Sequence, residues 1–147
     1  MLRRARREDA EAVAALFEAS RAEAMPWLPV LHTPEEDVVF FAGSIEREEL
    51  WVDEDEGRVT AFAAIHDGVL KHLYVHPDYQ RRGIGDALFA WATRAAPGGF
   101  RFWVFQRNER ARRFYERRGA RLVDLTDGAA NEEREPDALY EWRPGVG

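Results

Sequence analysis

The spacing of apolar residues in the first third of the chain is that of helices. Apolar side chains recur every three to four residues after Glu8, and this pattern stops before Pro26. The sequence Thr33-Pro-Glu-Glu36 then combines an N-cap residue, a proline at the first helical position and acids in the first turn. We therefore expect a short strand at 2–6, a helix that ends before Pro26, a proline-rich loop and a second helix over about 34–46.

Between residues 49 and 75 the pattern changes to that of strands. Branched and aromatic residues dominate the segments 49–53, 58–65 and 69–75, which are separated by the turn sequences Asp55-Glu-Gly57 and Asp67-Gly68. Turns this short join antiparallel neighbours. The region is predicted to be a meander of three antiparallel strands.

The rest of the chain alternates helices with strands. A glycine-containing loop follows residue 75, and glycines 98, 99 and 119 fall where helices should end. The expected elements are a helix from about 84 to 95, a strand over 100–105, a helix over 108–118, and strands near 120–126 and 138–143, the last of them at a sheet edge. The predicted fold class is α/β (α+β): a mixed, mostly antiparallel twisted sheet of six to seven strands flanked by about four helices.

Composition narrows the class of protein. The chain has 147 residues, of which 46% are hydrophobic, and no cysteine, which excludes disulfides and thiolate metal sites. No apolar run approaches the roughly 20 residues of a membrane span. We expect one domain over residues 1–147, a cytoplasmic location, and no metal or membrane partner. Residues 1–70 carry a net charge of −9 and residues 71–147 a net charge of +3, so the two halves could attract oppositely charged ligands.

The turn that follows Val75 has the features of a phosphate-binding loop. Gly83 and Gly85 allow a tight turn into a helix whose first N–H groups have no internal partner. Those groups and the helix dipole attract phosphate, and Arg81 and Arg82 add positive charge. The lysine followed by serine or threonine of a Walker loop is missing, and the glycine spacing is not that of a dinucleotide fingerprint.

Two stretches resemble the motifs of a known superfamily. The string Leu73-Tyr-Val-His-Pro-Asp-Tyr-Gln-Arg-Arg-Gly-Ile-Gly85 resembles the acetyl-CoA-binding motif of the GNAT N-acetyltransferases, and Asn108-Glu-Arg-Ala-Arg-Arg-Phe-Tyr-Glu-Arg-Arg-Gly-Ala120 resembles their second motif. Asp86 stands where that superfamily more often has Ser or Thr, and we expect its side chain to point toward the helix surface. Ala120 replaces the usual Phe, which should reduce core packing.

The resemblance implies direct transfer of acetyl from acetyl-CoA to a primary amine of a small molecule or peptide in a ternary complex, with Tyr115 as general acid. From the residues alone, Tyr115 also fits a core position and Asn108 an N-cap. The cofactor-binding residues implied by the resemblance are Leu73, Tyr74, Val75, Gln80, Arg81, Arg82, Gly83, Ile84, Gly85, Asp86, Asn108 and Phe114.

The acceptor side is less defined by the sequence. We expect the first two helices and the loop between them to form the acceptor pocket, with Trp27, His32 and His72 as candidate residues. The proton of the amine could go to His72, His32, Glu23 or a chain of waters. A homodimer is compatible with the sequence.

Two other classes of protein fit parts of the sequence. One is a module that binds acyl-CoA as a sensor and transfers nothing. The other is a nucleic-acid binder that uses the arginine-rich helix 107–121, which the net charge of −6 and the inward phase of Phe114 and Tyr115 disfavour.

Overall fold

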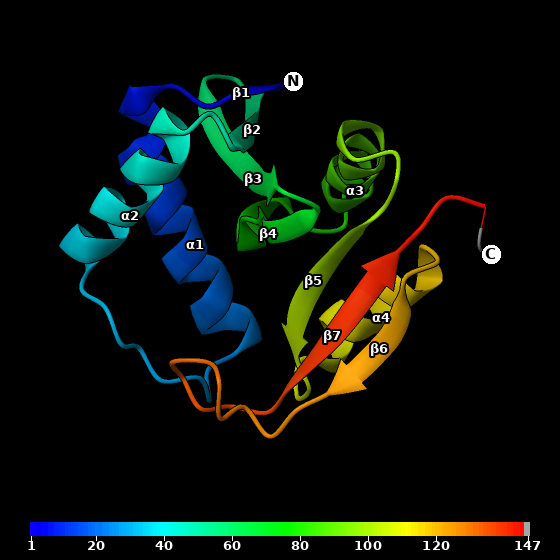
Figure 1. Ribbon diagram of the computed structural model, residues 1–147. Coiled ribbons are helices and arrows are strands. Elements are labelled where there is room, and N and C mark those ends of the chain that lie inside the picture. The colour runs from blue at the N-terminus through cyan, green and yellow to red at the C-terminus, as the bar shows by residue number, and fades with distance from the viewer. Residues whose placement is uncertain (146–147) are drawn as a thin grey trace.

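The computed structural model describes residues 1–145, in which seven strands form one sheet (Figure 1). The sheet order is β1-β2-β3-β4-β5-β7-β6, and every neighbouring pair is antiparallel except β4 and β5. This confirms the predicted mixed, mostly antiparallel sheet and its three-stranded meander. The strands are β1 (Leu2–Arg4), β2 (Leu50–Asp55), β3 (Arg58–His66), β4 (Val69–Val75), β5 (Phe100–Phe105), β6 (Arg121–Leu125) and β7 (Asp137–Trp142).

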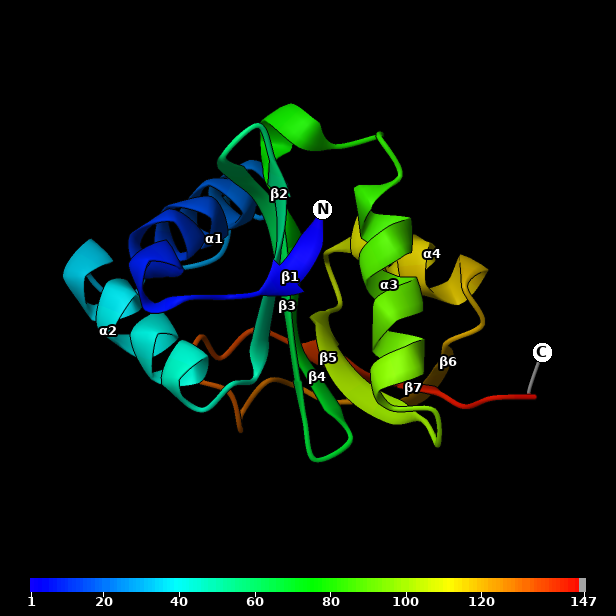
Figure 2. The same cartoon turned by 90° about the horizontal axis from the view of Figure 1, so that it is seen from above.

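Helices cover both faces of the sheet. Figure 2 shows α1 (Ala10–Ala24) and α2 (Pro34–Glu46) on one face, and α3 (Ile84–Ala95) and α4 (Glu109–Arg117) on the other. The start of α2 is the predicted capping sequence: the Glu36 N–H donates to Thr33 Oγ1 at 3.1 Å, and the Thr33 N–H donates to Glu36 Oε1 at 2.8 Å. A 3₁₀ turn precedes α1. No helix within residues 1–145 is both long and apolar enough to cross a bilayer.

The core lies on both faces of the sheet, and β3 shows why. Alternate side chains of a strand point to opposite faces. Ala61 and Ala63 belong to the cluster under α3 and α4, whereas Phe62 and Ala64 belong to the cluster under α1 and α2. All four are fully buried, so β3 is a central strand with hardly any polar side chain along its middle.

The last strand is not at the edge of the sheet, contrary to the sequence-based prediction. β7 lies between β5 and β6 and pairs with β5 from Phe100↔Trp142 to Phe105↔Asp137. Tyr140 is fully buried there and its ring stacks on Phe102 at 5.7 Å. The edge position belongs to β6, whose five residues are all exposed.

The sheet opens between β4 and β5. Their parallel ladder contains the single residue pair Val69↔Arg101, at the start of both strands. On its other side β4 stays paired with β3 as far as Val75. The carboxyl end of β4 therefore has one free edge, and the candidate site lies beside it.

Candidate active site

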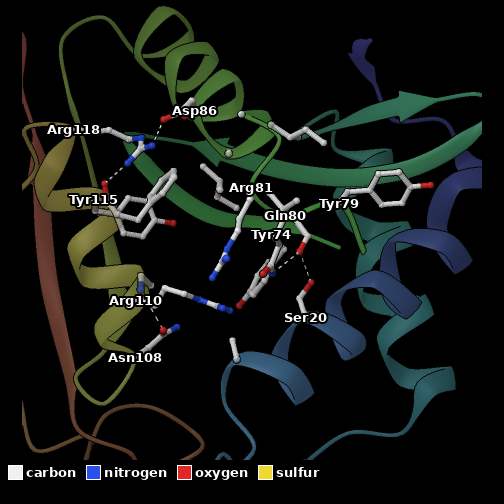
Figure 3. A pocket seen from close by; sticks show the side chains of 18 of the residues that line it. Ser20, Tyr74, Tyr79, Gln80, Arg81, Asp86, Asn108, Arg110, Tyr115 and Arg118 are labelled. Carbon is white, nitrogen blue, oxygen red and sulfur yellow. Dashed lines mark hydrogen bonds and ion pairs between the residues drawn. The ribbon is translucent and has the colours of Figure 1, made fainter. Parts of the chain in front are cut away.

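A cavity of about 440 Å³ lies where β4 and β5 separate. Its walls come from the end of α1, from β4, from the turn into α3 and from α4 (Figure 3). Every residue that the sequence suggested for cofactor binding lines this cavity except Arg82, whose guanidinium lies 5.2 Å from the centre of the Tyr79 ring. Two motifs separated by more than twenty residues thus form one continuous surface.

The start of α3 presents free amide groups to the cavity. Gly83 is in the left-handed region with φ +78°, and Arg81 also has a positive φ of +65°. The first hydrogen bond of the helix runs from the Ala87 N–H to the Gly83 carbonyl at 3.1 Å. The N–H groups of residues 84–86 precede this bond and have no helical acceptor. Three adjacent donors at a helix N-terminus, beside an arginine, fit a diphosphate.

The free edge of β4 faces the gap. The His76 N–H donates to the Thr60 carbonyl of β3 at 2.8 Å. Because backbone groups of successive residues point to opposite edges of a strand, those of Leu73 and Val75 point toward β5. The Val75 carbonyl already accepts bonds from Ser20 Oγ at 3.0 Å and Gln80 Nε2 at 3.3 Å. The Val75 N–H and the backbone of Leu73 are the groups left for a ligand that extends along this edge.

The position of Tyr115 fits both roles that the sequence left open, a core tyrosine and a general acid. Its ring is packed in the core, 4.4 Å from Phe102 and 5.9 Å from Phe89 between centroids, and the residue is 9% exposed. Its hydroxyl end lies in the cavity (Figure 3). Burial raises the pKa of Tyr115, and the nearby Tyr74 raises it further. The phenol is therefore protonated throughout the neutral range.

Asn108 caps α4, and Phe114 packs α4 against the start of α3. Asn108 Oδ1 accepts the Ala111 N–H at 3.3 Å, which caps α4, and Asn108 also lines the cavity. A Cβ added to Gly85 would lie 3.1 Å from Cε1 of Phe114. The second glycine of the motif therefore allows the close approach of the two helices.

The Asp86 side chain is 62% exposed, in keeping with the expected position at the helix surface. It lies at the rim of the cavity and forms an ion pair with Arg118. Arg118 also donates to the Phe114 carbonyl at 2.6 Å and stacks over the Phe114 ring at 3.5 Å. The negative charge that the sequence placed beside the phosphate loop is balanced by this arginine.

Other residues of the cavity were not identified from the sequence. Ser20, Ala24 and Met25 come from the end of α1, and Arg110 and Arg117 from α4. Ser20 shares the buried phase of α1, which is the one signal that it faces the sheet. The arginines stood out only as part of a basic run.

The three candidate acceptor residues do not lie together. His72 is on the α1 side of β4 among Phe17, Phe41 and Phe62, and the loss of solvation there lowers its pKa to about 4. Trp27 packs edge-on against Phe105 at 6.3 Å.

His32 pairs with a carboxylate, and Glu23 pairs with a guanidinium. His32 is exposed and bonds Glu132 at 2.9 Å, a contact that raises the His32 pKa. Glu23 pairs with Arg110 at 2.8 Å. No single cluster of candidate bases is formed.

Free helix-start amides that fit a diphosphate and a buried phenol open into one cavity, an arrangement that suits a transferase using an acyl-CoA. Residues 46–119 match the family model described as an acetyltransferase (GNAT) domain. The chain belongs to this family and is an N-acetyltransferase with acetyl-CoA as its acyl donor.

Individual proteins resemble this chain over nearly its whole length. The chain is 28% identical over 143 residues to the peptidyl-lysine N-acetyltransferase YiaC of Escherichia coli strain K12, covering 97% of this chain and 96% of that one. It resembles the apo form of YjaB from Escherichia coli with a TM-score of 0.80, 22% identity and coverage of 97% and 96%. It also resembles the PaiA N-acetyltransferase of Thermoplasma acidophilum in complex with coenzyme A, with a TM-score of 0.79, 19% identity and coverage of 97% and 98%. The last two likenesses show a shared fold.

Proposed function

We propose that the protein transfers acetyl directly to a primary amine of a peptide or small molecule in a ternary complex, with Tyr115 as general acid. The observation that carries the proposal is the single cavity that joins the start of α3 to the hydroxyl of Tyr115. An acyl donor bound by its diphosphate at one end would present its thioester toward the other.

The cavity residues divide into binding and reacting groups. The amides of residues 84–86 and the Arg81 side chain would hold the diphosphate, because charged phosphate oxygens make strong hydrogen bonds to such donors. The free edge at Leu73 and Val75 would hold the extended arm. Fixing the thioester beside the amine can supply several kcal/mol of the barrier reduction.

In the reaction, the amine nitrogen bonds to the thioester carbonyl carbon, the C–S bond breaks, and sulfur leaves as a thiolate. The phenol O–H of Tyr115 would donate to this sulfur as its charge develops and pass its proton to it. The nitrogen, which carries an extra proton after its attack, would lose that proton to the Tyr115 phenolate or to water and so become the neutral amide. Such a general acid contributes about 10²- to 10⁴-fold in rate.

The acceptor amine must lose a proton before it attacks, because an alkylammonium has a pKa of about 10.4. With a pKa of about 4, His72 is a weak base at neutral pH. His32 is held by Glu132 at the surface. We therefore propose that water molecules in the open cleft take this proton. The name of the similar YiaC supports the side chain of a lysine in a peptide as the amine.

The role of Tyr115 is tested by Tyr115→Phe, with Tyr79→Phe as the matched control because Tyr79 lines the same cavity. Turnover, followed as thiol release, should fall about 100-fold or more in the first variant. The dissociation constant for acetyl-CoA, measured by calorimetry, should change by less than about threefold, because the Tyr115 hydroxyl is assigned to the leaving group. A wild-type rate in Tyr115→Phe would refute the assignment. Tight binding of acetyl-CoA with no thiol release from any amine would favour the sensing module.

A further inference from the structure

A second concave surface lies on the other side of α1. Two cavities of about 300 and 590 Å³ share Phe17, His32 and Asp37 in their walls. The walls come from α1, α2, the loop between them and the loop between β6 and β7, which Figure 1 shows meeting along one side of the molecule. We call this surface the α2 groove.

Large apolar side chains are exposed along the α2 groove. Val30 is 89% exposed and Val39 is 73% exposed, and Leu31 and Phe40 are each about half exposed. All four line one of the two cavities. Exposed apolar side chains that gather around a concave surface are typical of a binding site.

Carboxylates surround these apolar side chains. Glu18, Glu35 and Asp37 line the α2 groove, and within residues 1–145 none of the three forms an ion pair with a cation. The basic side chains that line the groove already have carboxylate partners: Arg21 bonds Glu133 and His32 bonds Glu132. The groove therefore carries excess negative charge that no cation among residues 1–145 pairs with.

The crowding of these carboxylates shifts the pKa of Glu18. The side chain of Glu18 hydrogen-bonds Asp37, and this contact, with burial and the charges of Asp37 and Glu35, raises the Glu18 pKa to about 7. Besides Glu35, the charged or titratable groups that line the two cavities with this pair are Arg21, His32, Glu36, Glu132 and Glu133. A bound cation would remove the repulsion between the two carboxylates.

The α2 groove adjoins the catalytic cavity. Met25 lines both of them. Arg21 lines the groove, and its positive charge counteracts the rise that burial causes in the pKa of Tyr74, a residue of the catalytic cavity. A chain segment in the groove would lie next to the opening between β4 and β5.

We propose that the α2 groove docks the segment that flanks the acceptor lysine of a peptide, and that this segment is basic and bears an apolar side chain. The proposal rests on the proposed function for the reacting amine. Complementary charge selects a cationic segment, and the exposed apolar residues select a peptide over a small amine, which would leave them uncovered.

Three nine-residue peptides with blocked N-termini and a single lysine test the docking. The first has arginines and a leucine beside the lysine, the second replaces the arginines with glutamates, and the third replaces the leucine with serine. Thiol release gives kcat and KM, and the anisotropy of labelled peptides gives binding without turnover. The first peptide should have a kcat/KM about tenfold above the second, and this ratio should fall as salt rises.

Matched variants test whether the acidic residues of the α2 groove cause the preference for a basic peptide. The double variant Glu35→Gln with Asp37→Asn should raise KM for the first peptide about tenfold and leave kcat nearly unchanged. The control Glu11→Gln with Glu46→Gln removes the same charge from exposed positions on α1 and α2, outside the groove, and should leave KM unchanged.

The apolar contribution has its own pair of variants. Val39→Ser should weaken the leucine peptide about two- to fivefold and leave the serine peptide unaffected. Val123→Ser, at an exposed position on β6, should change neither.

The outcomes separate the docking site from the proposed function. Equal kcat/KM for all three peptides, with a small amine also acetylated, would leave the function intact and overturn the docking site. Selective binding of the first peptide, lost in the acidic double variant, together with no thiol release from any amine, would support docking and overturn the function. Self-association that sedimentation detects and Val39→Ser abolishes would assign the groove to a second copy and refute the proposal.

Discussion

Substitution of Gly83 by alanine tests the phosphate cradle most directly. Gly83 has a φ of +78° and ψ of 6° at the start of α3, a conformation that residues with a Cβ adopt at a cost. No protein atom lies within 4 Å of the position that a Cβ would take. The change therefore strains the backbone without an internal clash. The new methyl group enters open space at the wall of the cavity, which Gly83 itself lines.

The magnitude follows from these two effects. The left-handed conformation should cost about 1–2 kcal/mol in unfolding free energy, which corresponds to a fall in melting temperature of about 2–8 °C for a chain of this size. If the backbone relaxes or the methyl excludes the phosphate, at least one charge-assisted bond from an amide is lost. Such a bond is worth about 1.5–3 kcal/mol, so affinity for coenzyme A should fall about 10- to 150-fold.

Calorimetric titration with coenzyme A measures the affinity, and a thermal melt measures the stability. Gly68→Ala is the matched control, because Gly68 has a φ of +72°, also has no neighbour within 4 Å of its Cβ position, and lies in the turn between β3 and β4. Gly68→Ala should lose the same stability and no affinity. Unchanged affinity in Gly83→Ala, or an equal loss in Gly68→Ala, would refute the cradle.

Two further predictions concern stability. Tyr140→Phe should lower the free energy of unfolding by about 1–3 kcal/mol, because the Tyr140 hydroxyl accepts from Arg112 Nε at 3.0 Å and donates to Glu116 Oε2 at 2.5 Å. The loss should appear as a lower midpoint of urea unfolding, and an unchanged midpoint would contradict it. The Arg3 guanidinium donates a hydrogen bond to the Asp9 carboxylate and lowers the pKa of Asp9. This contact therefore stabilises the fold at pH values above the ordinary pKa of Asp9. The stabilisation is lost as pH falls through the lowered pKa. The difference in unfolding free energy between wild type and Asp9→Asn should therefore shrink between pH 7 and about pH 3, and a constant difference would contradict the assignment.

Most helices and strands could be predicted because their signals are local. The capping sequence at Thr33 and the glycine at 119 fix helix ends from neighbouring residues alone. The short turns between β2, β3 and β4 fix an antiparallel meander in the same way. The position of β7 could not be predicted, because its pairing with β5 joins residues 32 to 42 positions apart and depends on which strand buries Tyr140.

The candidate site was predicted as far as its residues are consecutive in the chain. The turn after β4 and the start of α4 each contribute a run of neighbours, so a motif could identify them. Ser20 and Met25 reach the cavity only because α1 packs across the end of β4, a tertiary contact with no sequence pattern of its own. The ion pair of Arg118 with Asp86 is also a tertiary contact without a sequence pattern, because the two residues are 32 positions apart. The α2 groove likewise joins residues 17–41 to the distant loop between β6 and β7.

The one parallel pair in the sheet explains why the two halves of the catalytic cavity meet. In a parallel pair the carboxyl ends of both strands lie at the same end of the sheet. The helix after β4 begins at that end with Gly83, and the helix after β5 begins there with Asn108. An antiparallel arrangement of β4 and β5 would place these two helix starts at opposite ends, so the cradle and Tyr115 could not share a cavity. Because the two strands pair only at Val69 and Arg101 and then separate, the space between the helix starts stays open for an acyl donor.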